Sequence, residues 1–141
     1  MYMINIPEIV KKIGINLNDC VVISSGTLHV LGIREANDID LVAIPGVYES
    51  LFTDSSYEHV KTFSGAINLQ KTIDGVEVEI LPKLHWEAYT KTAEEVIKDA
   101  FEVDGVKFMN LDDVKNFKKA LGREKDFKDL VLIEGFEKDC L

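Results

Sequence analysis

The first apolar residues of the chain recur at the spacing of one helix face. Ile6, Ile9, Val10 and Ile13 predict a helix over residues 4–13, which Gly14 ends. Beyond it, short apolar runs bounded by polar and glycine residues predict alternating strands and helices. The expected elements are a strand at 19–24, a short helix at 27–31, a strand at 38–44 and a helical turn at 47–52.

The second half of the chain continues this alternation. Asp74-Gly75 and Asp104-Gly105 are turn signals. The expected elements are strands at 59–63, 66–71 and 76–81, a mostly helical stretch at 86–100, a hairpin at 101–109, and helices at 111–121 and 125–136. Strands mixed with helices predict an α/β or α+β fold. A chain of 141 residues is expected to form a single domain, residues 1–141.

The composition is that of a globular protein, with 46% hydrophobic and 29% charged residues. No apolar run approaches the roughly 20 residues of a membrane span, and the N-terminal residues lack a secretory signal pattern, so the expected location is cytoplasmic. The formal net charge of −9 disfavours nonspecific nucleic-acid binding, which needs a basic surface. Cys20 and Cys140 form neither a disulfide framework nor a zinc-site pattern.

Two carboxylates in the strand expected at 38–44 are the strongest chemical signal. Asp38 and Asp40 point to one face of that strand, with Cα atoms roughly 6.5–7 Å apart, and Ile39 and Leu41 point to the other. Like charges this close need compensation, and two divalent cations about 3.5–4 Å apart can supply it while holding a phosphoryl group. Asp38 and Asp40 are therefore candidate metal ligands. The alternative is a solvated strand face.

A second acidic pair lies on the strand expected at 76–81. Glu77 and Glu79 alternate there with Val76, Val78 and Ile80. If this strand is a sheet neighbour of the aspartate strand, up to four carboxylates share one surface. Taken alone, the glutamate pair is better explained as a half-solvated sheet face.

Small and basic residues flank these carboxylates in the sequence. Ser24-Ser25-Gly26-Thr27 suits a phosphate, through free backbone N–H groups at a helix start, although ordinary helix capping explains the same residues when they are taken alone. Residues 118–130 carry dense charge of both signs, which alone is typical of a solvated amphipathic helix. The histidines show no metal-ligand spacing and are expected to be structural or exposed: His29, His59 and His85.

Read together, SSGTLHVLGIREANDIDLVAI resembles the signature of the polymerase-beta-like nucleotidyltransferase superfamily. That signature combines a small-residue turn, a short helix ending in a Gly-x-Arg-like stretch, and Asp-Ile-Asp on a strand. GREKDFKDL is similar to the ending of small bacterial members, among them antibiotic nucleotidyltransferases and nucleotidyltransferase toxins. The resemblance implies a minimal nucleotidyltransferase fold, in which helices flank a mixed twisted sheet.

The resemblance also implies roles for single residues. Asp38 and Asp40 would ligate Mg²⁺, with two ions expected, and a strand carboxylate would complete the catalytic triad. Glu79 is favoured over Glu77 as that third acid, because it directly precedes Ile-Leu. Nucleotide contacts are implied for Ser25 and Gly26, and phosphate contacts or attachment of the last helix to the core are implied for Lys118, Arg123 and Lys125.

The expected function is magnesium-dependent transfer of a nucleoside monophosphate from an NTP, such as ATP, to an acceptor hydroxyl. The alternative is a protein of the same fold that is catalytically weak or inactive and binds a nucleotide or a partner. The acceptor is left open among a small molecule, a protein and a tRNA end. A homodimer is one way to complete the acceptor pocket, and no membrane partner is expected.

Overall fold

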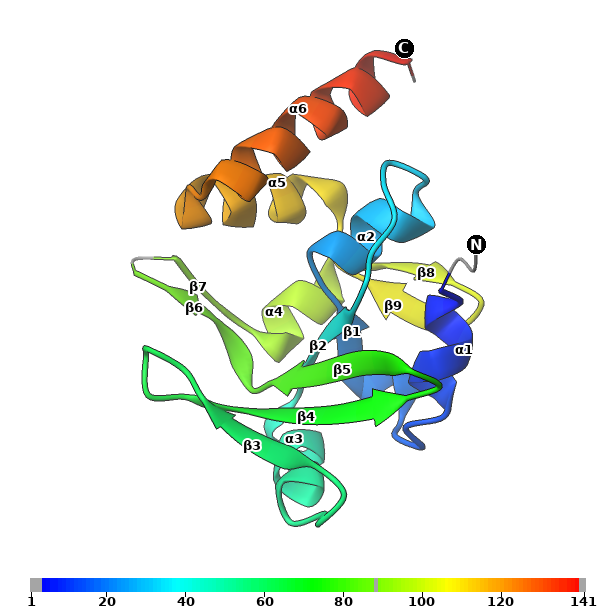
Figure 1. The fold of residues 1–141 in the computed structure, drawn as a ribbon, viewed down its shortest axis with the longest axis vertical. Helices are drawn as coiled ribbons and strands as arrows, with labels where there is room; N and C mark the ends of the chain where they lie inside the picture. Colours follow the sequence, from blue (N-terminus) through cyan, green and yellow to red (C-terminus); the bar gives the residue numbers. More distant parts are fainter. Residues whose placement is uncertain (1–3, 88, 140–141) are drawn as a thin grey trace.

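A seven-stranded mixed sheet forms the centre of the molecule (Figure 1). The computed structural model describes residues 4–87 and 89–139. The strand order is β3-β4-β5-β2-β1-β9-β8. The strands are β1 (Cys20–Val22), β2 (Ile39–Ala43), β3 (Glu58–Lys61), β4 (Ile67–Ile73), β5 (Val76–Leu81), β8 (Phe101–Val103) and β9 (Val106–Phe108). A separate hairpin is formed by β6 (Lys83–Trp86) and β7 (Tyr89–Thr92).

Strand β2 lies in the middle of the sheet. It pairs antiparallel with β1 and parallel with β5, which places Asp40 opposite Glu79. Strand β5 pairs antiparallel with β4 on its other side. The two acidic strands are therefore sheet neighbours, as the shared carboxylate surface requires.

Helices cover both faces of the sheet (Figure 1). They are α1 (Ile6–Lys11), α2 (Ser25–Val30), α3 (Pro45–Phe52), α4 (Ala93–Lys98), α5 (Leu111–Leu121) and α6 (Glu124–Asp139), with a 3₁₀ turn at Leu17–Asp19. Ile39, Leu41 and Ala43 of β2 pack in one core with α1 and α3. Val42 packs in the second core, which includes residues of α4, α5 and α6.

The face of β2 that carries Asp40 is the face covered by α5 and α6. Asp40 alternates with Ile39 and Leu41 and so shares its side of the strand with Val42, which packs against those helices. Helix α5 ends at Gly122, which has φ of 61° and so turns the chain into α6. The site therefore forms between the sheet and the last two helices.

One expected element is wrong. Residues 86–100 are mostly not helical: Trp86 ends β6, β7 follows, and only α4 is helix. The physical reason is a capping box at Thr92, whose hydroxyl accepts a hydrogen bond from the N–H of Glu95 while the Glu95 carboxylate accepts from the Thr92 N–H. The residues before this cap pair as a hairpin, with Leu84 opposite Lys91.

The remaining elements agree with the expectations to within a few residues, including the 101–109 hairpin and the two final helices. The described part of the chain contains no helix of the length and apolar character needed to cross a membrane.

Candidate active site

Asp40 and Glu79 form the centre of the candidate site. They are register partners on the parallel strands β2 and β5, and both side chains are half-buried. Asp38 differs from the expectation in its position, because it lies just before β2 and is exposed. Its charge nevertheless acts on Asp40, so the three acids share one electrostatic environment.

Burial and neighbouring negative charges both act on the pKa of Asp40. Burial, together with the charges of Asp38, Glu79 and Glu77, raises the pKa of Asp40 to about 7. The positive charge of Lys125 acts in the opposite direction. Asp40 therefore lies where a cation would be strongly favoured.

The two glutamates of β5 have different surroundings. Burial raises the pKa of Glu79, while hydrogen bonds from Asn68 and Gln70 oppose that rise. Gln70 donates through its side-chain amide to both carboxylates, at 3.2 Å to Glu79 and 2.6 Å to Glu77. Glu77 is exposed and lies in a different surface depression, whereas Glu79 is opposite Asp40. This geometry favours Glu79 as the third acid.

A polar cavity of about 330 Å³ opens beside Asp40. Its lining combines hydroxyls, carboxylates and four basic side chains: Ser24, Ser25, Arg34, Asn37, Asp38, Asp40, Lys118, Arg123, Lys125, Asp126 and Asp129. The structure thus brings together the predicted residues Ser25, Lys118, Arg123 and Lys125 with both aspartates.

Gly26 is the predicted nucleotide contact that does not line this cavity. It is buried, and a Cβ atom at its position would lie 2.2 Å from Cγ1 of Val22. The glycine is therefore required for close packing of α2 on β1. Ser24 lines the cavity instead, with φ of 55°, a left-handed conformation that is rare for a residue other than glycine.

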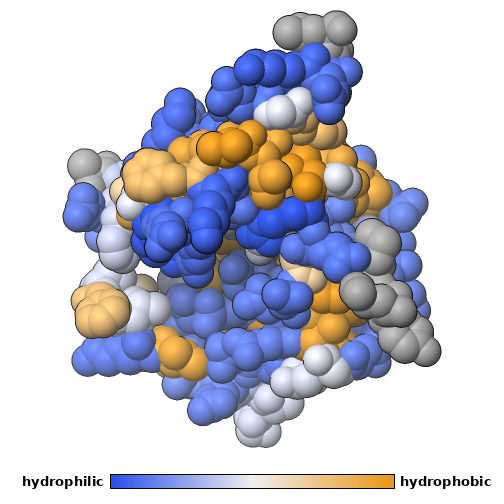
Figure 2. Space-filling view, turned by 45° about the horizontal axis from the view of Figure 1, so that its top comes forward, coloured by the Kyte–Doolittle hydropathy of each residue, from blue (hydrophilic) through white to orange (hydrophobic). Residues whose placement is uncertain are grey.

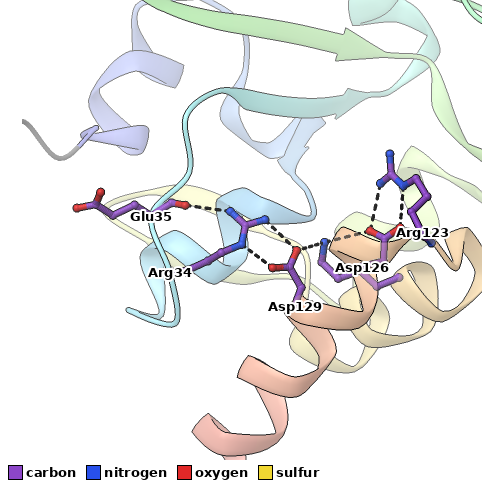
Figure 3. Close-up of polar contacts among 6 residues, drawn as sticks. Arg34, Glu35, Arg123, Asp126 and Asp129 are labelled. Carbon is purple, nitrogen blue, oxygen red and sulfur yellow. Dashed lines mark hydrogen bonds and ion pairs between the residues drawn. The ribbon is translucent and has the colours of Figure 1, made fainter.

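The basic residues of the cavity are not equally free (Figure 3). Lys118 is 2% exposed and its Nζ lies 2.8 Å from Asp129 and 3.7 Å from Asp126. Arg123 donates to Asp126 from Nε at 2.7 Å and from Nη2 at 3.1 Å. Lys125 has no ion-pair partner within residues 4–87 and 89–139, so its charge is the most available to a bound anion.

Arg34 joins the segment before β2 to the last helix. It donates two hydrogen bonds to Asp129, from Nε at 2.6 Å and from Nη2 at 2.9 Å (Figure 3). Burial alone would raise the pKa of Asp129, but the hydrogen bonds from Arg34 and Lys118 outweigh it and the pKa is lowered. Asp129 is therefore ionised and holds α6 against the loop that carries Asp38.

A second cavity of about 290 Å³ also has Asp40 in its lining. Glu79, Asn68 and Thr62 supply polar groups, and the apolar part of its lining is large: Ile23, Phe63, Ala66, Leu81, Leu84, Trp86, Phe117 and Leu121. Ser24, Asp40 and Arg123 line both cavities. Figure 2 shows this face of the molecule hollowed, with hydrophilic residues around the hollow and a hydrophobic band above it.

The acids do not form a ready-made cage for a metal ion. Among the described residues, no group of three or more His, Cys, Asp or Glu side chains is close enough to hold one. Mg²⁺ usually takes only one or two protein carboxylates and completes its shell with water and substrate phosphates. The hard oxygens of Asp38, Asp40 and Glu79 fit an ion bound in that way.

His29 and His59 lie outside both cavities. His29 accepts a hydrogen bond at Nδ1 from the N–H of Ala36, and its Nε2 lies 2.8 Å from the carbonyl oxygen of Ile4. These contacts fix a neutral ring that donates from Nε2. His85 does line the apolar cavity, where its Nδ1 lies 2.8 Å from the Thr90 hydroxyl.

Several lining residues of these cavities were not predicted from the sequence. Arg34 had a usable signal, since it is one of only two arginines and follows the helix beside the aspartates. Asp126 and Asp129 also stand within the GREKDFKDL segment, without an assigned role. Asn68 and Trp86 had no local signal, because only the tertiary fold brings them to the site.

Comparison with known proteins supports the fold assignment. No protein-family model matches the chain, and no curated protein matches its sequence. The structure is similar to the crystal structure of a "putative nucleotidyltransferase" from Thermotoga maritima, with a TM-score of 0.61 and 20% sequence identity over 94% of this chain and 91% of that one. The chain therefore has the nucleotidyltransferase fold, and the predicted fold class is confirmed.

Proposed function

We propose that this protein is a nucleotidyltransferase that moves a nucleoside monophosphate from an NTP to an acceptor hydroxyl. The observation that carries the proposal is the position of Asp40 on the border of two cavities, one polar with basic residues and one largely apolar. A phosphoryl group held at Asp40 would face a triphosphate site on one side and an acceptor site on the other. Two substrates can thus meet at one pair of carboxylates.

The polar cavity suits the triphosphate. Ser24 and Ser25 offer hydroxyl donors, and the exposed Lys125 offers a positive charge. Lys118 and Arg123 already neutralise Asp126 and Asp129, so they contribute mainly by fixing the wall of the cavity. Lys125 is therefore the basic residue from which we expect the strongest direct phosphate contact.

Asp38 and Asp40, with Glu79, would hold Mg²⁺, and the resemblance of the sequence implies two ions. The metal would supply charge neutralisation for the carboxylates and the phosphates. The raised pKa of Asp40 is consistent with this, because burial and the nearby carboxylates both disfavour a bare negative charge at this position. The carboxylates would bind the ion together with the nucleotide, in line with the absence of a preformed three-ligand group among the described residues.

We expect Glu79 to orient the acceptor. In the proposed reaction the acceptor oxygen bonds to the α-phosphorus, the bond from that phosphorus to the bridging oxygen breaks, and pyrophosphate leaves. The hydroxyl proton passes to a carboxylate, for which Glu79 is the candidate because it lines the apolar cavity and Glu77 does not. Asn68 and Gln70 hold the Glu79 carboxylate in position.

The apolar cavity indicates the kind of acceptor. Its aromatic side chains, Phe63, Trp86 and Phe117, favour a molecule that carries its hydroxyl on an apolar or aromatic body. Among the acceptors left open by the sequence, this lining favours a small molecule.

A second candidate function is nucleotide binding without turnover. The observation that favours it is the exposed position of Asp38 before β2, apart from the half-buried pair of Asp40 and Glu79. Such a protein would bind NTP and Mg²⁺ in the polar cavity without transferring the nucleotide.

The experiment that separates these functions uses NTPs labelled at the α-phosphate, Mg²⁺ and cell extract as the source of acceptors. Transfer by the wild-type protein, lost in Asp40→Asn and retained in the exposed control Asp112→Asn, supports the proposed enzyme. Thermal stabilisation by NTP and Mg²⁺ without any labelled product supports the binding function. A fully active Asp40→Asn variant contradicts the assignment of the site.

A further inference from the structure

We propose that Asp126 is a positioning residue for nucleotide transfer. It fixes the guanidinium of Arg123 at the border of the two cavities, where that charge would stabilise the α-phosphoryl group in the transition state. This role rests on the proposed function and deepens it, because it separates Lys125, which binds the NTP, from Arg123, which assists the reaction.

Arg123 is a basic residue that lines both cavities. Lys118 and Lys125 line the polar cavity and not the apolar one, and Lys83 lines only the apolar one of the two. The reacting phosphorus is expected at the border, beside Asp40, if NTP and acceptor occupy the two cavities. Negative charge on the oxygens of that group is stabilised best by a donor that is already fixed in place. Arg123 has the charge and the location for this task.

Asp126 holds the Arg123 side chain by two hydrogen bonds (Figure 3). Nε of Arg123 donates to Oδ2 at 2.7 Å and Nη2 donates to Oδ1 at 3.1 Å. A two-point contact of this kind fixes the plane of the guanidinium. The third nitrogen, Nη1, points away from Asp126, and no acceptor for it is found in residues 4–87 and 89–139. Arg123 is thus held on one edge and keeps a donor on the other, with 47% of its side chain exposed.

Asp126 is bound more extensively than helix capping requires. Its Oδ2 also accepts from the N–H of Arg123 at 3.1 Å, which is an ordinary contact at the start of α6. That contact needs one oxygen and no burial, yet the Asp126 side chain is fully buried and its second oxygen binds the guanidinium.

The ionisation of Asp126 supports the same role. Burial alone would raise the pKa of Asp126, but the hydrogen bonds from Arg123 and the charges of Arg123 and Lys118 outweigh it and the pKa is lowered. Asp126 is therefore an anion at neutral pH, as a charged two-point contact requires.

Loss of the Asp126 charge should slow transfer without weakening NTP binding. Asp126→Asn keeps an oxygen for the N–H of Arg123 but gives up the charged two-point contact, so the guanidinium keeps its charge and loses its fixed direction. Lys125 still binds the triphosphate in this variant. We expect an unchanged NTP affinity and a rate at saturating NTP that is about 10²-fold lower, the scale for misplacing a group at the reacting centre.

The test measures the rate of label transfer from α-labelled NTP to the acceptors of cell extract, with NTP and Mg²⁺ saturating. Calorimetry without extract gives the NTP affinity. Arg123→Lys should also lower the rate, because lysine keeps the charge but lacks the planar fork. Arg123 is exposed, so this variant tests the proposal even where Asp126→Asn does not fold. The control is Glu124→Gln, at an 89% exposed carboxylate of α6 outside both cavities, and it should retain the wild-type rate.

A double variant tests whether Asp126 acts through Arg123. Arg123→Gln is expected to lower the rate by about 10²-fold, the scale for losing one fixed donor to a transition state. Adding Asp126→Asn should cause little further loss, because the side chain that it positions is already gone. Losses that multiply in the double variant would give Asp126 a structural role only and overturn the proposal.

The remaining outcomes separate this role from the proposed function. Transfer by the wild type that Arg123→Lys and Asp126→Asn leave unchanged overturns the role of Asp126 alone. So does a weaker NTP affinity with an unchanged rate at saturation, which would make Arg123 a binding residue. Absence of transfer by the wild-type protein overturns both the proposed function and the role.

Discussion

Asp40 and Glu79 stand opposite each other on two parallel strands, although 38 residues lie between them in the chain. Neighbouring strands are about 4.8 Å apart, so two carboxylates on one face are forced close together. Their repulsion, together with the burial of Asp40, makes ionisation of Asp40 unfavourable in the folded protein.

Asp40→Asn is expected to remove a loss of stability that the wild type shows as the pH rises from about 4 to about 7. The pKa of Asp40 is about 7 in the folded protein, above the roughly 3.9 of an unfolded chain. Between these two values the folded state holds the proton and the unfolded state does not, so the free energy of unfolding falls with rising pH and levels off above about pH 7. Denaturant titrations of metal-free protein between about pH 5 and about pH 8 should show this fall in the wild type and a smaller one in Asp40→Asn.

The matched control for that series is Asp112→Asn, at an exposed carboxylate on α5. Its stability curve should run parallel to that of the wild type. Parallel curves for the wild type and Asp40→Asn would contradict the prediction.

Lys125→Gln is expected to weaken NTP binding roughly tenfold, which corresponds to about 1.4 kcal/mol. Lys125 lines the polar cavity without an ion-pair partner in the described residues, so the lost charge is not replaced. Calorimetric titration with NTP and Mg²⁺ measures the change. Lys119→Gln, an exposed change on α5 outside the cavity, should bind as the wild type does, and equal affinities for both variants would remove Lys125 from the phosphate site.

Trp86→Ala is expected to raise KM for the acceptor while the affinity for NTP stays the same. Trp86 lines the apolar cavity but not the polar one. Steady-state kinetics with an acceptor recovered from the labelling experiment would measure both constants. Phe52→Ala, an aromatic change on α3 outside both cavities, serves as the control. A loss of NTP affinity in Trp86→Ala would mean that the nucleobase, not the acceptor, occupies this cavity.

Asp129→Asn is expected to lower the free energy of unfolding by about 3 kcal/mol, the scale for removing one partner of a buried ion pair. Asp129 pairs with both Arg34 and Lys118, and Lys118 is buried. Denaturant titration at neutral pH gives the value. Glu124→Gln breaks only an exposed pair with Lys128, so its curve should overlay that of the wild type. If Asp129→Asn changes the free energy of unfolding as little as Glu124→Gln does, the ion pairs of Asp129 with Arg34 and Lys118 add little to stability.

Gly26→Ala is expected to destabilise the protein by roughly 1–3 kcal/mol through overpacking against Val22. Adding Val22→Ala removes the atom that clashes, so the double variant should be more stable than the sum of the two single changes predicts. Gly46→Ala in α3, where a Cβ atom meets nothing within 4 Å, is the matched glycine control and should not be destabilised. If the two changes in the free energy of unfolding simply add, the clash with Val22 is absent in Gly26→Ala, which would mean that the backbone adjusts at Gly26.

The sequence predicted well the features that depend on neighbouring residues. It predicted less well the features that depend on which strands pair and in which register. The alternation of Asp38 to Leu41 and of Val76 to Leu81 indicated two acidic strands, but the register that sets Asp40 against Glu79 needed the fold. The helix expected from Trp86 onward failed because a short hairpin competed with it, and the Thr92 cap decided where the helix starts.

The basic residues show the same division. The sequence predicts one group of basic residues with two possible roles: Lys118, Arg123 and Lys125. In the structure Lys118 and Arg123 pair with buried aspartates, whereas Lys125 has no ion-pair partner among the described residues. Burial and ion pairing depend on the tertiary fold, so the spacing of residues along the sequence could not distinguish Lys118 from Lys125.

The pair between Arg34 and Asp129 also has a consequence for the order in which the site can form. A ribosome makes strand β2 and its aspartates about 80 residues before it makes α6. The loop before β2 has no Asp129 to bind until that helix has been synthesised and has docked. A partly made chain thus carries the aspartates without the finished cavity, and the site is complete only after α6 has been made and has docked.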